Sequence, residues 1–255
     1  MKKIIIIALS IFPLFFYLPA MAEEADPNVS FLKGEYLRAL ENYEKLSERN
    51  DLVQYRIGIC YLKLGKYEKA EEELKKVFSY TKSALFDDAQ FARGEALYLG
   101  GNFAEAIKAY QQLTKEHPES SLLHLALFKL GMTYLKKGGL PSGGRDGEEK
   151  EALKYFKRVR TSYPLSFEAA KSNRIIFQKE GPFSIQIGAF VNLTRARNVA
   201  RDFQKKGYDA YLLKKIKDKP WIYKVRIGNF KSRAKAILFT PQLPEKTDFF
   251  ITKEE

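Results

Sequence analysis

A glycine-anchored pattern recurs along the N-terminal part of the chain and constrains what it can fold into. The anchors are Gly34, Gly65, Gly101 and Gly138, at spacings of 31, 36 and 37 residues. In the first three units an aromatic residue follows two positions later, an alanine five positions later and a bulky residue nine positions later. A pattern that recurs in phase at this period predicts stacked helical hairpins, each of which buries its apolar face only against its neighbours.

The residues at the recurring positions suggest which repeat this is. They are Tyr36, Tyr67 and Phe103, then Ala39, Ala70 and Ala106, then Tyr43, Leu74 and Tyr110. A fourth unit has Ala152 and Phe156 in the matching positions. The pattern resembles the tetratricopeptide repeat, a helix–turn–helix of about 34 residues, over about residues 28–178. Residues 165–177 are expected to form a capping helix.

The resemblance implies a groove lined by the first helix of each unit. By the phase of the family its residues are Tyr55, Ile59, Leu62, Phe91, Glu95, Tyr98, Phe128, Met132 and Leu135. An apolar groove with aromatic residues suits an extended or helical peptide, so we expect an unidentified protein partner there. The alternative is that a short array curls tightly and these side chains pack against each other.

One glycine-rich segment, residues 138–147, is reminiscent of a phosphate-binding loop. It lacks the Gly-Lys-Ser/Thr ending of such loops, and no strand is expected before it. The segment falls at the turn between the two helices of the fourth unit. We therefore expect an insertion of about nine residues in that turn.

After Gly181 and Pro182 the helical pattern gives way to alternating apolar and polar residues. Strands are expected at residues 183–187, 210–213, 221–227 and 249–252. Asn192 and Ser232 are expected to cap two intervening helices, of which the second is stopped early by Pro241. The order βαββαβ allows both helices to cover one face of a four-stranded sheet.

Three motifs in this region resemble SPOR domains, which bind peptidoglycan glycan strands. Residues 186–190 resemble the Gln-x-Gly-x-Phe of the first strand, and residues 206–211 the Gly-aromatic-x-Ala entry to the second. Residues 223–230 are similar to the third-strand motif Tyr-Arg-Val-x-Val-Gly-Pro-Phe, except that Asn229 replaces the proline. The fold class expected for the whole chain is thus an α-helical solenoid followed by a small βαββαβ (ferredoxin-like) α/β sandwich.

The resemblance implies binding to glycan strands from which the peptides have been removed. Strand alternation turns Ile185, Ile187, Val225 and Ile227 toward the helices. The opposite face, expected to be open to solvent, then carries the candidate glycan-binding residues Ser184, Gln186, Tyr211, Lys224 and Arg226. A cationic face with an amide suits a carboxylated acetamido-sugar, because removal of the peptide frees the lactyl carboxylate. The alternative is an ordinary solvated sheet face.

Charge is concentrated in the same region. Residues 183–255 carry 16 Lys and Arg against 7 Asp and Glu, whereas residues 23–182 carry 26 against 24. A local excess of positive charge favours an anionic partner. The sequence therefore predicts an envelope scaffold that acts in cell division or envelope maintenance. The alternative is a protein-interaction scaffold without glycan binding.

The N-terminus has the three parts of a secretory signal peptide. Lys2 and Lys3 precede an apolar run over residues 4–18, and Ala20-Met21-Ala22 follows. The run is shorter than the roughly 20 residues that span a bilayer. We expect cleavage after Ala22 and a periplasmic protein, with a helical domain at residues 23–180 and a SPOR domain at residues 181–255. The junction between these domains is expected to be short and stiff.

Other functional classes find little support. RNA-recognition sheets need stacking aromatics on the first and third strands, where this chain places Ser184, Gln186, Lys224 and Arg226. No hydrolase or protease motif is present, so no catalytic residue and no enzyme activity are expected. The single cysteine, Cys60, is expected to be a buried small hydrophobe. We expect no cofactor, no metal site and no nucleic-acid partner.

Overall fold

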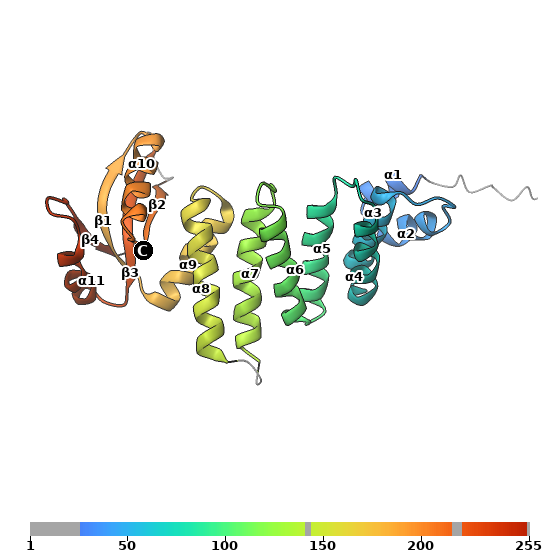
Figure 1. The fold of residues 1–255 in the computed structure, drawn as a ribbon, viewed down its shortest axis with the longest axis horizontal. Helices are drawn as coiled ribbons and strands as arrows, with labels where there is room; N and C mark the ends of the chain where they lie inside the picture. Colours follow the sequence, from blue (N-terminus) through green and yellow to red (C-terminus); the bar gives the residue numbers. More distant parts are fainter. Residues whose placement is uncertain (1–25, 141–143, 216–220, 254–255) are drawn as a thin grey trace, which may run out of the picture.

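The computed structural model describes residues 26–140, 144–215 and 221–253 (Figure 1). An array of helices comes first and a four-stranded sheet with two helices follows it. The helices of the array are α1 (Pro27–Leu32), α2 (Tyr36–Glu44), α3 (Asp51–Lys63), α4 (Tyr67–Lys76), α5 (Phe86–Leu99), α6 (Phe103–Glu116), α7 (Leu123–Gly138), α8 (Arg145–Ser162) and α9 (Phe167–Glu180). A 3-10 turn, Val77–Ser79, follows α4.

The anchor glycines end helices. Gly34, Gly65 and Gly101 have φ values of 79°, 73° and 82°, and each lies between the two helices of a hairpin. Only glycine adopts this left-handed conformation at little cost, which explains its recurrence. The fourth anchor differs, because Gly138 is the buried last residue of α7. The insertion predicted after it falls partly on residues 141–143, which lie outside the described residues.

Close helix contact depends on a second set of glycines. A Cβ atom on Gly58, Gly94 or Gly131 would lie 2.5–2.6 Å from a buried side chain of the next helix. The three side chains so contacted are Leu74, Tyr110 and Phe156. The recurring alanines at positions 39, 70, 106 and 152 are fully buried beside them. Small residues of one helix therefore lie against bulky side chains of the next, which lets neighbouring helices approach closely.

The sheet follows after two residues. Its strands are β1 (Phe183–Phe190), β2 (Ala210–Lys215), β3 (Ile222–Phe230) and β4 (Phe250–Lys253), in the order β2-β3-β1-β4 with antiparallel pairing. The helices are α10 (Leu193–Lys205) and α11 (Arg233–Phe239), which Asn192 and Ser232 cap as predicted. Pro241 lies in a 3-10 turn, Thr240–Gln242, directly after α11. The predicted βαββαβ order is confirmed.

The two faces of the sheet have different neighbours. Ile185, Val225 and Ile227 are fully buried and pack with residues of α10 and α11. The opposite face meets the helical array, where α8 contacts β2 and α9 contacts β3. Figure 1 shows α8 and α9 next to the sheet, at the end of the array opposite α1. The helix predicted at residues 165–177 is therefore α9, which packs on both α8 and the sheet instead of facing solvent as a cap.

Some predictions lie outside the described residues. The signal peptide at residues 1–22 and the turn at residues 217–220 are among them. Within the described residues, no helix combines the length and the apolar character needed to cross a bilayer.

Candidate binding surfaces

The candidate glycan-binding residues lie on one face of the sheet, as predicted. Tyr211 on β2 is paired with Arg226 on β3, which is paired with Gln186 on β1. Their side chains therefore form a row across three strands, on the face away from α10 and α11. Ser184 and Lys224 belong to the same face by alternation.

The prediction that this face is open to solvent is wrong. Ser184 and Tyr211 are fully buried, and Gln186 and Arg226 are only 4% and 3% exposed. Lys224 is half-buried. The alternation was correct, but the prediction treated the C-terminal region as an isolated module. In the whole chain the last helices of the array cover this face.

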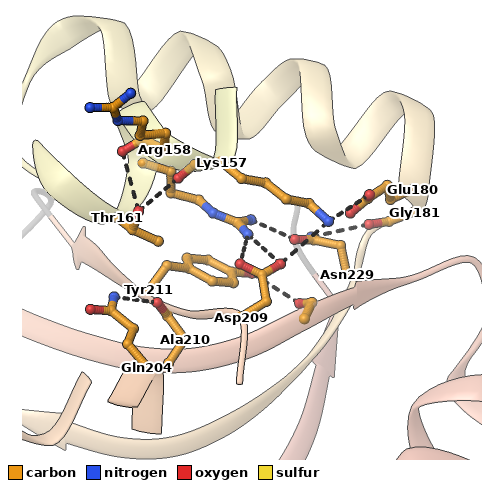
Figure 2. Close-up of polar contacts among 12 residues, drawn as sticks. Lys157, Arg158, Thr161, Glu180, Gly181, Gln204, Asp209, Ala210, Tyr211 and Asn229 are labelled. Atoms are coloured by element: carbon orange, nitrogen blue, oxygen red, sulfur yellow. Dashed lines mark hydrogen bonds and ion pairs between the residues drawn. The ribbon is translucent and has the colours of Figure 1, made fainter. Parts of the chain in front are cut away.

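One side chain of the array dominates this contact. Arg160 on α8 is fully buried, and its guanidinium carbon lies 3.7 Å from the ring centroid of Tyr211 (Figure 2). The guanidinium also donates to both carboxylate oxygens of Asp209 at 2.7 Å and to Oδ1 of Asn229 at 2.6 Å. The ring of Tyr211, a candidate glycan-binding residue, is thus in contact with an arginine of the same chain. Bidentate, charge-assisted bonds of this kind are among the strongest in proteins.

Asn229 connects the arginine to the chain junction. Its Nδ2 donates to the carbonyl oxygen of Gly181 at 3.2 Å, while its Oδ1 accepts from Arg160. A proline, which SPOR domains have at this position, offers neither group. The departure from the family motif therefore has a structural role here. Sequence reasoning noted Asn229 but did not identify Arg160, whose position matches no motif.

Further contacts surround this network. Lys157 on α8 lies 2.7 Å from a carboxylate oxygen of Glu180 and 3.6 Å from one of Asp209 (Figure 2). Gly181 has a φ of 121°, and a Cβ atom there would collide with the carbonyl oxygen of Phe230. Position 181 must therefore be glycine, since the two backbones approach so closely. The junction is short, as predicted, and its ends are held by side-chain bonds.

Several buried polar atoms in this region have no hydrogen-bond partner among the described residues. They include Ser184 Oγ and Gln186 Oε1 on the sheet, Ser172 Oγ and Asn173 Oδ1 on α9, and Arg160 Nε on α8. A buried polar atom without a partner costs about 1–3 kcal/mol. Native interiors hold few such atoms, so these are positions where a water molecule or a ligand would bind favourably.

The predicted groove residues lie on α3, α5 and α7. Leu62 is buried, and the other eight are partly exposed. Phe91 and Phe128 pack against the rings of Tyr110 and Phe156, with centroids 5.7 and 5.6 Å apart. These two aromatic residues therefore contribute to the core, as the alternative interpretation expected.

A polar contact crosses the groove and was not predicted. Lys129 on α7 forms an ion pair with Glu95 on α5, with its Nζ 5.7 Å from the ring centroid of Tyr98. Burial, with the nearby carboxylates of Asp88 and Glu95, raises the pKa of Tyr55 to about 12. The groove thus combines half-buried rings with one internal ion pair.

The remaining candidates are the single cysteine and a metal site. Cys60 is fully buried, and burial raises the pKa of its thiol to about 12. Within residues 26–140, 144–215 and 221–253, no three His, Cys, Asp or Glu side chains form a group able to hold a metal ion.

Curated proteins and solved structures with similar repeats were found. BBSome complex member BBS4 of Bos taurus is 24% identical over 160 residues, covering 62% of this chain and 28% of that protein. The Mus musculus protein is 28% identical over 109 residues, covering 42% and 20%. The chain therefore spans less than a third of the length of these relatives.

Among solved structures, MamA has a TM-score of 0.48 and 21% identity, covering 71% of this chain and 91% of that one. The second TPR domain of human RPAP3, solved with an HSP70 peptide, has a TM-score of 0.37 and 25% identity, covering 42% and 88%.

Family comparisons cover both parts of the chain. Residues 53–83, 88–120 and 125–166 match tetratricopeptide repeats, and residues 179–252 match the SPOR domain. Both are binding families and not catalytic ones: tetratricopeptide repeats bind proteins, and SPOR domains bind peptidoglycan. The motifs, the fold and these matches agree, and the chain is a tetratricopeptide-repeat protein with a C-terminal SPOR domain.

Proposed function

We propose that this protein is an exported envelope scaffold, which binds denuded glycan strands of peptidoglycan through its SPOR domain and a protein partner through its repeat groove. The observation that carries the proposal is the SPOR match over residues 179–252. The excess of 16 Lys and Arg over 7 Asp and Glu in residues 183–255 supports an anionic ligand.

The buried sheet face adds a condition to this proposal. Gln186, Tyr211 and Arg226 are inaccessible while α8 and α9 lie against the sheet. A glycan strand that used these residues would have to displace the two helices. The glycan-binding role of Ser184, Gln186, Tyr211, Lys224 and Arg226 therefore remains a prediction.

The test is co-sedimentation of the purified chain with sacculi, before and after amidase treatment removes the peptides. We expect more protein to pellet with treated sacculi, and less as salt is raised, because counterions screen charge pairs near the surface. Equal and negligible sedimentation with both preparations would refute glycan binding.

That negative result would favour the second candidate, a protein-interaction scaffold without glycan affinity. One observation supports this alternative. The guanidinium of the chain's own Arg160 lies over the ring of Tyr211, where a sugar was expected.

The proposed protein partner would lie along α3, α5 and α7. The half-buried side chains of Tyr98 and Met132 and the ion pair of Glu95 with Lys129 offer both apolar and charged contacts. With a partner identified, Tyr98→Ala with Met132→Ala is expected to weaken its binding. Leu99→Ala, at an exposed neighbouring position, serves as the control.

Export remains a proposal based on the N-terminal sequence pattern. Mass spectrometry of the native protein from the envelope fraction is expected to find a mature N-terminus at Glu23. A mature N-terminus at Met1 would refute export with cleavage after Ala22.

A further inference from the structure

A cleft of about 550 Å³ opens where α9 meets β2. Its walls come from both domains: Asn173, Arg174 and Phe177 from α9, and Leu213 and Lys214 from β2. Neither domain alone forms the cleft, because each contributes one wall. None of the residues that line it is acidic.

Asn173 supplies a hydrogen-bond acceptor that lacks a donor. Its side chain lines the cleft and is only 6% exposed, and its Oδ1 has no partner among the described residues. An acceptor buried in this way is stabilised by a ligand that brings an N–H or O–H group.

Arg174 supplies a cation at the cleft and is exposed on α9. Lys214 also lines the cleft, but alternation turns its side chain to the α10 face, where its Nζ lies 3.4 Å from the ring centroid of Trp221. With no carboxylate in the lining, Arg174 favours an anionic ligand. Phe177 and Leu213 provide an apolar wall beside it.

The backbone of β2 offers further hydrogen-bonding groups. This strand is at the edge of the sheet, and the bond from Gly228 N–H to Asp209 C=O fixes which residues pair with β3. By alternation Leu212 and Lys214 direct their N–H and C=O groups away from the sheet. Consistent with this, the C=O of Ala210 points outward and accepts from the side chain of Gln204 at 2.7 Å.

We propose that this cleft binds an N-acetylated sugar that carries a carboxylate, the chemistry of a denuded glycan strand. The inference rests on the proposed function and names its site. Arg174 pairs with the lactyl carboxylate, Asn173 accepts from an amide or hydroxyl group, and the apolar wall covers the acetyl methyl group.

A sugar bound in this cleft would not have to displace α8 and α9 from the sheet. The cleft is open while α8 and α9 stay in place, so a sugar reaches it without breaking the bonds of Arg160. The site lies beside the row of Tyr211, Arg226 and Gln186, on the margin of the sheet face.

The first test is sedimentation of the full chain with amidase-treated sacculi. Arg174→Gln is expected to weaken binding about 10- to 150-fold, the range for losing a hydrogen bond to a charged group. Arg174 is exposed, so folding is little at risk. Arg158→Gln removes the same charge from an exposed site on α8 and is expected to bind as wild type.

The outcomes separate the inference from the proposed function. Wild-type binding by Arg174→Gln would reject the cleft and leave glycan binding standing. Stronger binding by Arg160→Ala would also reject it, since release of the sheet face would then be what exposes the site. No binding by the wild-type chain would reject both proposals.

The second test is calorimetric titration of the full chain with N-acetylmuramic acid. A heat of binding is expected, and N-acetylglucosamine, which lacks the lactyl carboxylate, is expected to have a much smaller effect. Equal responses to the two sugars, or a response only to an acidic peptide such as pentaglutamate, would overturn the proposal.

Discussion

The chain contains two kinds of helix contact that differ in chemistry. Between helices of the array, a glycine of one helix lies against a buried leucine or aromatic ring of the next, at Gly58, Gly94 and Gly131. Between the array and the sheet, a buried arginine bonds to a carboxylate and an amide. The first contact is apolar and repeated, and the second is polar and occurs at one place.

This difference determines what each contact does. Apolar packing is non-directional and adds stability with each unit, so one altered unit leaves the others in place. The junction instead concentrates directional bonds on Arg160, so its geometry depends on a single side chain. We therefore expect the junction to respond more sharply to one substitution than the array does.

The largest expected effect is that of Arg160→Ala. Removal of one partner of a fully buried ion pair costs about 3–5 kcal/mol, and we expect no more than about 3 because Asp209 is 30% exposed and Lys157 stays near it. Trp221 fluorescence reports unfolding of the SPOR domain, and far-UV circular dichroism reports mainly unfolding of the array. The two urea unfolding transitions are expected to coincide in the wild type and to separate in the variant.

Arg158→Ala provides the control for this experiment. Arg158 is exposed on the same helix, and its guanidinium points away from the polar network of Arg160 (Figure 2). Its two transitions are expected to coincide as in the wild type. If the Arg160→Ala transitions also coincide, the polar network does not couple the two domains.

Asn229→Ala is expected to have the next largest effect. The variant loses the bond from Arg160 and the bond to Gly181 while keeping the strand, and a bond to a charged group is worth about 1.5–3 kcal/mol. The free energy of unfolding followed by Trp221 should fall by that amount, which moves the midpoint to a lower urea concentration. An unchanged midpoint would mean that the substitution of Asn for the proline of the family has no role in stability.

Gly131→Ala tests the apolar contact between helices by its effect on stability. The added methyl group would meet the buried ring of Phe156 at 2.6 Å, and overpacking of this kind costs about 1–3 kcal/mol. Gly147→Ala is the matched control, because this helical glycine is exposed and a Cβ atom there meets nothing within 4 Å. Thermal melts should show destabilisation by the first and stabilisation of about 0.4–1 kcal/mol by the second.

The smallest expected effect concerns Cys60. Burial raises the pKa of its thiol to about 12, so the thiol stays protonated at any pH below that value. Only the thiolate reacts with iodoacetamide, and we expect no labelling of the native chain at pH 8 and full labelling in urea. Rapid labelling without denaturant would show that the array opens around α3.

The contrast between the contacts also explains which features the sequence predicts. The glycine and aromatic periodicity predicted the array, and strand alternation placed Gln186, Tyr211 and Arg226 on one face. Alternation cannot say what covers that face, because the answer depends on helices packed from elsewhere in the chain. Arg160 is 49 residues from Asp209 and 69 from Asn229, and nothing in its neighbourhood marks it.

The buried junction also affects how the two domains act together. A flexible tether lets a bound domain hold its neighbour at a high effective concentration over many directions. Here the polar network and the close approach of Gly181 to Phe230 fix one direction instead. A surface that binds the SPOR domain would therefore set the orientation of the repeat groove, and only a partner approaching at the matching angle would reach both.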